Sequence, residues 1–89
     1  MWRTGIRRAK RGKTLKIDIK LEGDHVREVV ISGDFSAYPE EAIDRLESAL
    51  RDKRVAEIPH ILRKFREEVE LVGITYDDLV ELILELVRR

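Results

Sequence analysis

The chain has 89 residues, the length of one small domain, and we expect residues 1–89 to fold as a single domain. Hydrophobic residues make up 43% and charged residues 40%, so an apolar core should lie beneath a densely ionic surface. Cysteine is absent, which excludes disulfides, a thiolate nucleophile and thiolate metal sites. Asparagine and glutamine are absent too, and this composition predicts a hyperthermophilic source.

Charge is unevenly distributed along the chain, although the net charge is zero. Residues 1–20 hold eight basic residues and one acidic residue, a net charge of +7, and residues 21–89 carry −7. This asymmetry should orient docking onto an oppositely charged partner. The sequence contains no apolar run as long as a membrane span or a signal peptide, so we expect a cytoplasmic protein with no membrane partner.

The first third of the chain alternates in polarity and predicts strands. Residues 14–21 place four apolar side chains on one face: Leu15, Ile17, Ile19 and Leu21. A turn at residues 22–24 leads into a β-branched run over residues 25–32, which predicts an antiparallel hairpin. The alternation slips between Val26 and Val29, where we expect a bulge. Residues 2–9 also alternate as an edge strand does, with Trp2, Thr4 and Ile6 between Arg3, Gly5 and Arg7.

The first predicted helix covers residues 42–50. Pro39 suits its first turn, where a missing N–H costs nothing, and Glu40 and Glu41 complement the positive end of the helix dipole. The apolar residues follow the three-four spacing of a buried stripe: Ala42, Ile43, Leu46, Ala49 and Leu50.

Two further helices are predicted after it. The second should begin near Ile58, with Pro59 in its first turn, and continue to Gly73, which stops it. Thr75 should cap the third, with Asp78 three residues on in capping-box position. Its buried face should comprise Leu79, Leu82, Ile83 and Leu86. Because the strands precede the helices, we expect an α+β fold: a small antiparallel sheet of two or three strands followed by three helices packed on it.

No set of residues predicts catalytic or metal-binding chemistry. His25 and His60 are 35 residues apart and lack carboxylates at ligand spacing. Adjacent residues on a helix diverge, so the three acidic pairs cannot act as catalytic dyads: Glu40-Glu41, Glu67-Glu68 and Asp77-Asp78. The five glycines are isolated and form no phosphate-binding loop. We therefore predict no catalytic, cofactor-binding or metal-ligating residue, which disfavours a self-contained enzyme.

The basic N-terminal segment leaves nucleic-acid binding as the alternative function. Residues 65–89 resemble a helix-turn-helix with its turn at residues 72–74. Phosphate would be repelled by the acidic residues of the second helix: Asp77, Asp78, Glu81 and Glu85. A small nucleic-acid-binding module that uses the basic segment is thus the less favoured hypothesis.

The segment at residues 31–41 can be interpreted in two ways. Gly33 permits an unusual backbone angle, Asp34 can bond nearby amides and Phe35 can pack beneath the following helix, so the segment can be a purely structural turn. Equally, Phe35 and Tyr38 can form an aromatic patch that docks a larger protein.

Three segments together resemble the accessory, C-terminal domain of lipoate–protein ligases, which in some archaea and bacteria is a separate small subunit. They are Gly12-Lys13-Thr14-Leu15-Lys16-Ile17-Asp18-Ile19-Lys20, then Val29-Val30-Ile31-Ser32-Gly33-Asp34-Phe35 with Tyr38-Pro39-Glu40-Glu41, and Gly73-Ile74-Thr75-Tyr76-Asp77-Asp78-Leu79. Members of the family activate lipoate with ATP to lipoyl-adenylate and transfer the lipoyl group to a lysine of an acceptor domain. Those steps belong to a large catalytic domain.

The resemblance implies a non-catalytic subunit that docks on a separate catalytic ligase subunit and enables lipoate adenylation for protein lipoylation. It implies that the complex uses ATP, Mg and lipoate, that this chain alone binds no cofactor, and that acceptor proteins are indirect partners. The implied contact surface comprises Gly33, Asp34, Phe35, Tyr38, Pro39 and Glu40, and a second candidate patch comprises Arg7, Arg8, Lys10 and Arg11.

Overall fold

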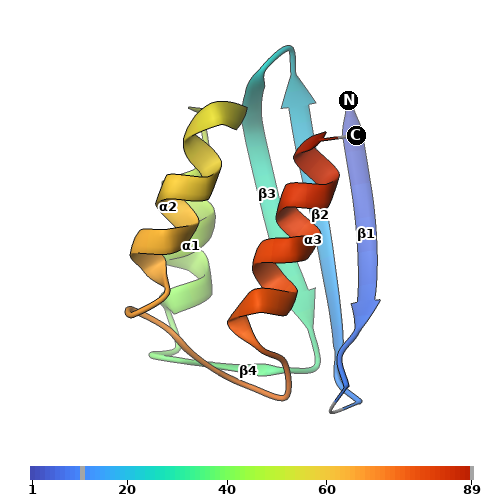
Figure 1. Cartoon of the computed structure of the whole chain (residues 1–89), viewed down its shortest axis with the longest axis vertical. Coiled ribbons are helices and arrows are strands. Elements are labelled where there is room, and N and C mark those ends of the chain that lie inside the picture. The colour runs from blue at the N-terminus through green and yellow to red at the C-terminus, as the bar shows by residue number, and fades with distance from the viewer. Residues whose placement is uncertain (11, 89) are drawn as a thin grey trace.

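The computed structural model describes residues 1–10 and 12–88, which form a sheet flanked by helices (Figure 1). The strands are β1 (Trp2–Arg8), β2 (Thr14–Glu22), β3 (His25–Gly33), β4 (Ser36–Tyr38), β5 (Lys53–Arg54) and β6 (Glu70–Val72). The helices are α1 (Ala42–Leu50), α2 (Ile58–Phe65) and α3 (Tyr76–Arg88), with a 3₁₀ turn at Val55–Glu57.

The sheet is larger than the sequence predicts. Four antiparallel strands pair in the order β1-β2-β3-β5, and β4 and β6 form a separate two-stranded antiparallel ribbon. The prediction of a two- or three-stranded sheet followed by helices was therefore wrong in its strand count and in its strict order. The extra strands have only two or three residues each, too few to show an alternation in polarity.

The β2–β3 hairpin confirms the predicted pairing and its bulge. Lys20 faces Glu28 and the next residue, Leu21, faces Val26, so Arg27 is the extra residue in β3. The apolar side chains predicted on one face of β2 form the centre of the core, where Leu15, Ile17 and Ile19 are fully buried.

In β1 the apolar residues are not the buried ones. Gly5 is buried, whereas Trp2, Thr4 and Ile6 lie on the exposed side of the strand. Helix α3 approaches β1 so closely that a Cβ atom on Gly5 would lie 2.7 Å from Leu82 Cδ1. The close packing of α3 therefore determines which side of β1 is buried, and the alternation in polarity along the strand does not.

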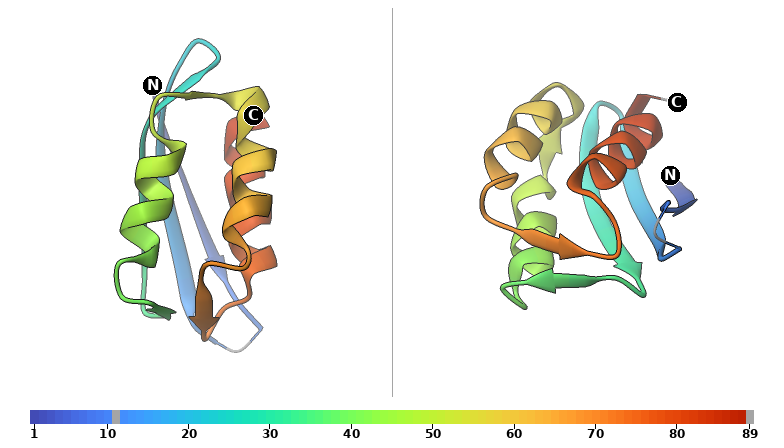
Figure 2. Two further views of the ribbon diagram at one scale, coloured as in Figure 1. Left: turned by 90° about the vertical axis from the view of Figure 1, so that its left-hand side faces the viewer. Right: turned by 60° about the horizontal axis from the view of Figure 1, so that its bottom comes forward.

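The helices enclose the core from two sides. Helix α3 packs over β1 and β2, while α1 lies along the outer edge of β3, and α2 contacts both helices (Figures 1 and 2). The Glu47 carboxylate on α1 accepts a 2.7 Å hydrogen bond from the Ile31 amide of β3. Helix α1 thereby occupies the place beside β3 where another strand would lie, and Glu47 satisfies a donor on that edge.

The predicted first helix, residues 42–50, is confirmed as α1, but the place of Pro39 and the end of the second helix were predicted wrongly. Pro39 lies outside α1, after a cis Tyr38–Pro39 peptide bond, and Glu41 is the N-cap residue. Helix α2 ends at Phe65, because the apolar residues after it belong to strand β6 instead of a continued helix. The start of α2, with Pro59 in the first turn, is confirmed.

The predicted capping box of α3 is confirmed. Thr75 Oγ1 accepts a hydrogen bond from the Asp78 amide, and an Asp78 carboxylate oxygen accepts one from the Thr75 amide, at 3.0 and 2.9 Å. Its buried face includes all four predicted residues: Leu79, Leu82, Ile83 and Leu86.

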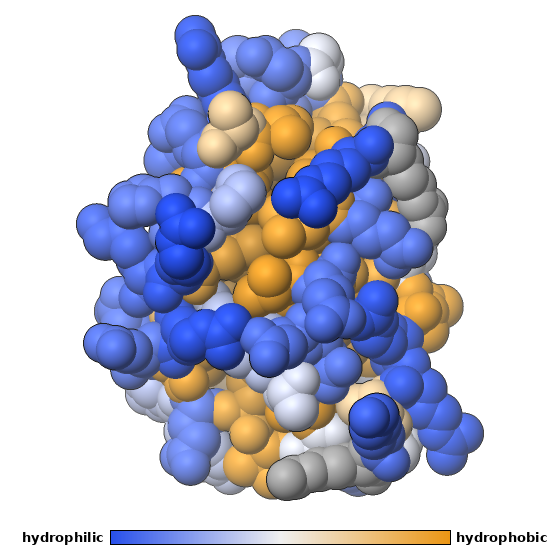
Figure 3. Space-filling view, viewed as in Figure 1, coloured by the Kyte–Doolittle hydropathy of each residue, from blue (hydrophilic) through white to orange (hydrophobic). Residues whose placement is uncertain are grey.

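The surface is mostly charged but has an apolar furrow on the helical side. Apolar side chains gather in the middle of this face with charged groups around them (Figure 3). A groove of ≈ 150 Å³ runs there between α2 and α3 and is lined in part by Pro59, Val80 and Leu84. Within the described residues, no helix has the length and apolar content that a membrane crossing requires.

Candidate partner-docking surface

The predicted contact residues lie at the end of the molecule where β3 leaves the sheet and β4 begins (Figure 2). Gly33 allows this departure. Its φ of +151° lies in a region that other residues rarely adopt, and a Cβ atom there would lie 2.1 Å from the Thr14 carbonyl oxygen. Only glycine fits opposite β2 at this point.

Asp34 links the end of β3 to the start of β2 at the same corner. Its carboxylate accepts a 2.7 Å hydrogen bond from the Thr14 amide, at the start of β2. That bond lowers the pKa of Asp34 from its ordinary value, and the nearby cations of Lys13 and Arg8 lower it further. Gly33 and Asp34 therefore have the structural roles that the sequence allows. Arg8, from the second candidate patch, lies near Asp34 of the first candidate surface.

An open groove of ≈ 370 Å³ follows this corner toward α1. From the predicted set it is lined by Gly33, Phe35, Tyr38 and Glu40, together with Ile31, Ser32, Ser36, Ala37 and Ile43. Phe35 is half-buried and packs against the core, whereas Tyr38 is 53% exposed. Tyr38 can therefore contact another protein, and Phe35 mainly supports the groove floor.

Strand β6 adds a residue that sequence reasoning missed. Ser36 of β4 faces Val72 of β6, and Val72 is 51% exposed. The β4–β6 ribbon thus presents two large apolar side chains, Tyr38 and Val72. The signal for Val72 was weak, because its segment resembled the end of a helix.

The loop that carries β6 is closed at its base by the start of α3. Arg66 pairs with Asp77 at 2.6 Å, and its guanidinium lies 5.0 Å from the centre of the Tyr76 ring. The Tyr76 hydroxyl donates a 2.6 Å hydrogen bond to the Leu62 carbonyl, and burial raises the pKa of Tyr76 to about 12. These contacts hold the two ends of the loop together, so that β6 reaches β4.

The second candidate patch is only partly available. Arg7 forms a 2.7 Å ion pair with Glu81 of α3, and Arg3 donates to the Leu86 carbonyl near the end of that helix. Arg8 and Lys10 are exposed, and Lys10 borders a groove of ≈ 430 Å³ that also includes Asp77, Asp78 and Glu81. Arg11 lies outside the described residues. Much of the basic segment therefore faces carboxylates of the same chain, an arrangement that weakens its attraction for phosphate.

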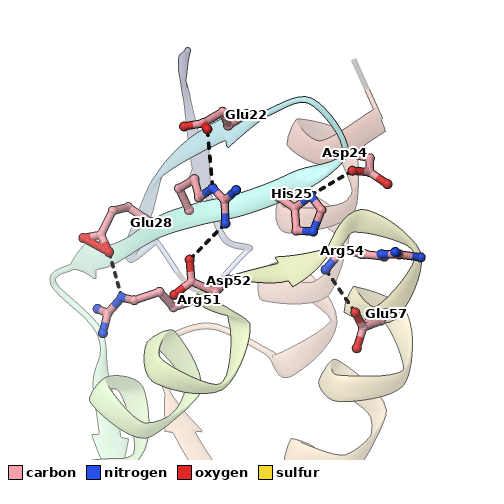
Figure 4. Close-up of polar contacts among 9 residues, drawn as sticks. Glu22, Asp24, His25, Glu28, Arg51, Asp52, Arg54 and Glu57 are labelled. Carbon is pink, nitrogen blue, oxygen red and sulfur yellow. Dashed lines mark hydrogen bonds and ion pairs between the residues drawn. The ribbon is translucent and has the colours of Figure 1, made fainter.

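The opposite end, around the β2–β3 turn, is held by ion pairs (Figure 4). Arg51 Nε lies 2.7 Å from a Glu28 carboxylate oxygen, and Arg27 lies between Asp52 at 3.3 Å and Glu22 at 3.8 Å. His25 Nδ1 lies 2.8 Å from an Asp24 carboxylate oxygen, and His60 is exposed on α2. Residues 1–10 and 12–88 contain no cluster of three metal-ligating side chains.

The geometry describes a small α+β domain whose candidate site is an open surface. A search with family models finds no match. Lipoate-protein ligase A subunit 2 of Thermoplasma acidophilum is 33% identical over 75 residues, covering 83% of this chain and 79% of that protein. A chain in the solved structure of a bipartite lipoate protein ligase and its E2 lipoyl domain, from an archaeal lipoylation system of the same organism, matches with a TM-score of 0.82. That match has 30% identity and covers 91% of this chain and 92% of the other.

These similarities extend over most of both chains in sequence and in structure. The chain belongs to the family of lipoate-protein ligase A subunit 2. The resemblance carried by the three sequence segments is thereby confirmed.

Proposed function

We propose that this chain is the non-catalytic subunit of a two-component, ATP-dependent lipoate–protein ligase. It docks on a separate catalytic subunit and enables that subunit to form lipoyl-adenylate for protein lipoylation. The observation that supports the proposal is the similarity to lipoate-protein ligase A subunit 2 over 83% of the chain. ATP, Mg²⁺ and lipoate are used by the complex, and lipoyl-acceptor proteins are modified by it.

The open groove and the β4–β6 ribbon form the proposed contact surface. Exposed Tyr38 and Val72 supply apolar area, and aromatic residues are common anchors at protein interfaces. Gly33 and Asp34 position the ribbon without contributing much contact area of their own. A partner seated here would be held against a rigid corner, since Asp34 is bonded to the Thr14 amide.

Docking can promote adenylation without any reacting group from this chain. A subunit that closes over an active site excludes water and stabilises the loop arrangement in which the reactants meet. Such a role requires a well-positioned surface and a complementary partner.

The test is formation of lipoyl-adenylate by the catalytic subunit from the same genome, measured with ATP, Mg²⁺ and lipoate. We expect little product from either protein alone and strong product formation from the mixture. Full activity of the catalytic subunit without this chain would overturn the proposal. Binding of a duplex or single-stranded oligonucleotide at low salt, measured in parallel, reports on the alternative nucleic-acid function.

A further inference from the structure

Strand β1 leaves one side of the four-stranded sheet unpaired in the described part of the chain. Two hydrogen bonds join Met1 to Leu21 of β2: the Met1 nitrogen donates to the Leu21 carbonyl at 2.9 Å, and the Met1 carbonyl accepts from the Leu21 amide at 2.8 Å. Beyond the other end of β1, the Ala9 amide donates to the Lys13 carbonyl. Antiparallel pairing alternates, so the odd residues of β1 bond to β2. The N–H and C=O groups of the even residues therefore point outward: Trp2, Thr4, Ile6 and Arg8.

The same four residues place their side chains on the exposed side of the sheet. Trp2 is 52% exposed and Ile6 is 67% exposed, which is unusual for such large apolar side chains in a short strand. The strand has no proline, and its register with β2 has no irregularity. Strand β1 therefore lacks a proline and a β-bulge, two features with which proteins commonly protect a sheet edge from pairing.

The charges on this edge indicate what kind of strand fits there. Arg3 and Arg7 of β1 already contact α3, so the basic groups that remain on the exposed side include Arg8 of β1 and Lys16 of β2, which faces Ile6. Asp18 beside them accepts a hydrogen bond from Thr4. A second copy of this chain would add another Arg8 and Lys16 to the same basic surface. A segment with carboxylates among its apolar residues would instead be attracted.

We propose that β1 is a strand-docking edge that receives an extended, acidic segment of the catalytic ligase subunit. The added strand pairs with the outward amides and carbonyls of Trp2, Thr4, Ile6 and Arg8 and covers Trp2 and Ile6. The inference rests on the proposed function for the identity of the partner, and it adds a second contact, at β1, to the one proposed at the groove and the β4–β6 ribbon. Main-chain bonds supply affinity, and Arg8 selects an acidic strand.

Amide hydrogen exchange tests the pairing directly. In the protein alone, the amides of Thr4, Ile6 and Arg8 should exchange rapidly, while those of Arg3, Gly5 and Arg7 are protected by β2. In the complex with the catalytic subunit, the even amides should become at least about tenfold slower, whereas the odd amides change little. Unchanged exchange at Thr4, Ile6 and Arg8 in a saturated complex would overturn the proposal.

Proline at position 6 removes one outward donor without removing a bond to β2. We expect Ile6→Pro to weaken binding at least about tenfold and Ile6→Val, which is similar in size and keeps the N–H, to weaken it much less. Equal affinities for the two variants would contradict strand pairing. A melting curve checks that Ile6→Pro is folded, and if it is not, the exchange pattern of the native protein decides.

Charge reversal tests the nature of the added strand. Arg8→Glu should weaken binding about tenfold at low salt and less at high salt. An unchanged affinity would show that the segment is not acidic. Failure of the proposed function is recognised separately, because then the catalytic subunit neither binds this chain nor depends on it, whereas failure of the strand model leaves binding and activation intact.

Discussion

The two ends of the molecule use polar groups differently. At the β2–β3 turn, Glu28 pairs with Arg51 and Arg27 bridges two carboxylates, so these charges are paired within the chain. At the other end, Asp34 bonds a backbone amide, and Tyr38 and Val72 remain exposed. The first end is completed by its own side chains. The second leaves apolar area exposed, which is the property expected of a docking surface.

The largest effect on stability should come from Gly33→Ala. The new Cβ atom would overlap the Thr14 carbonyl in a backbone conformation that alanine disfavours, so β2 and β3 must separate at this corner. We expect a loss of about 3 kcal/mol in the free energy of unfolding, measured by urea denaturation. Gly23→Ala, in the turn at the opposite end, is the control. It has a φ of +61° but no atom within 4 Å, so its cost should be about 1 kcal/mol. Equal costs would contradict the steric explanation.

Tyr38→Ala should separate binding from stability. The side chain is 53% exposed, so its truncation should change the free energy of unfolding by less than about 1 kcal/mol. If it anchors the partner, affinity for the catalytic subunit should fall by about 2 kcal/mol, or about thirtyfold. Titration of lipoyl-adenylate formation measures this, with Glu28→Ala at the opposite end as the matched control. The docking surface is misplaced if both variants activate the catalytic subunit equally.

Glu47 connects α1 to the β3 edge beside the groove. Glu47→Ala leaves the Ile31 amide without its acceptor and should destabilise the fold by about 1.5 kcal/mol, whereas Glu47→Gln keeps an acceptor oxygen and should cost less. Thermal or urea unfolding of both variants makes the comparison. Similar losses for alanine and glutamine would mean that the carboxylate charge, not the hydrogen bond, matters.

The pH dependence of this contact has a definite sign. Burial raises the pKa of Glu47 above 4.5, so the folded state holds this proton more tightly than the unfolded state does. The stability contributed by protonated Glu47 is present below pH 4.5 and is lost as pH rises through the raised pKa. As the pH rises from 4.5 through the raised pKa of Glu47, the free energy of unfolding of the wild type should therefore fall relative to that of Glu47→Gln. An opposite trend in the difference between their unfolding free energies would contradict it.

The smallest effects should come from the ion pairs at the β2–β3 turn. Arg51 and Glu28 are each 43% exposed, so their pairing should contribute only about 0.5 kcal/mol and should weaken with added salt. A double-mutant cycle with Arg51→Ala and Glu28→Ala isolates the pairwise energy. A coupling well above 1 kcal/mol would show that this end is held more tightly than surface ion pairs normally are.

Sequence reasoning succeeded where the information is local. The alternation over β2 predicts its buried face, and Thr75 with Asp78 predicts the start of α3. The same reasoning missed β4, β5 and β6, because two or three residues become a strand only when a distant segment lies beside them. It also misjudged the end of α2.

In the candidate site, too, features that depend on local sequence were predicted, and features that depend on distant contacts were not. Gly33 and Asp34 could be identified from one segment, but their partner Thr14 lies 20 residues from Asp34. Val72 and the Arg7–Glu81 pair depend on contacts across most of the chain. Predicting which arginines remain available for a partner required the position of α3, which the local pattern of the basic segment does not contain.

The β4–β6 ribbon has a consequence for the order of folding. Its two strands have three residues each and enclose both α1 and α2 in the intervening chain, so closing it costs more chain entropy than forming the β2–β3 hairpin. So short a ribbon has little stability of its own and depends on the packed helices. It should therefore form late and open first. The docking surface would then be the last part of the chain to acquire its shape.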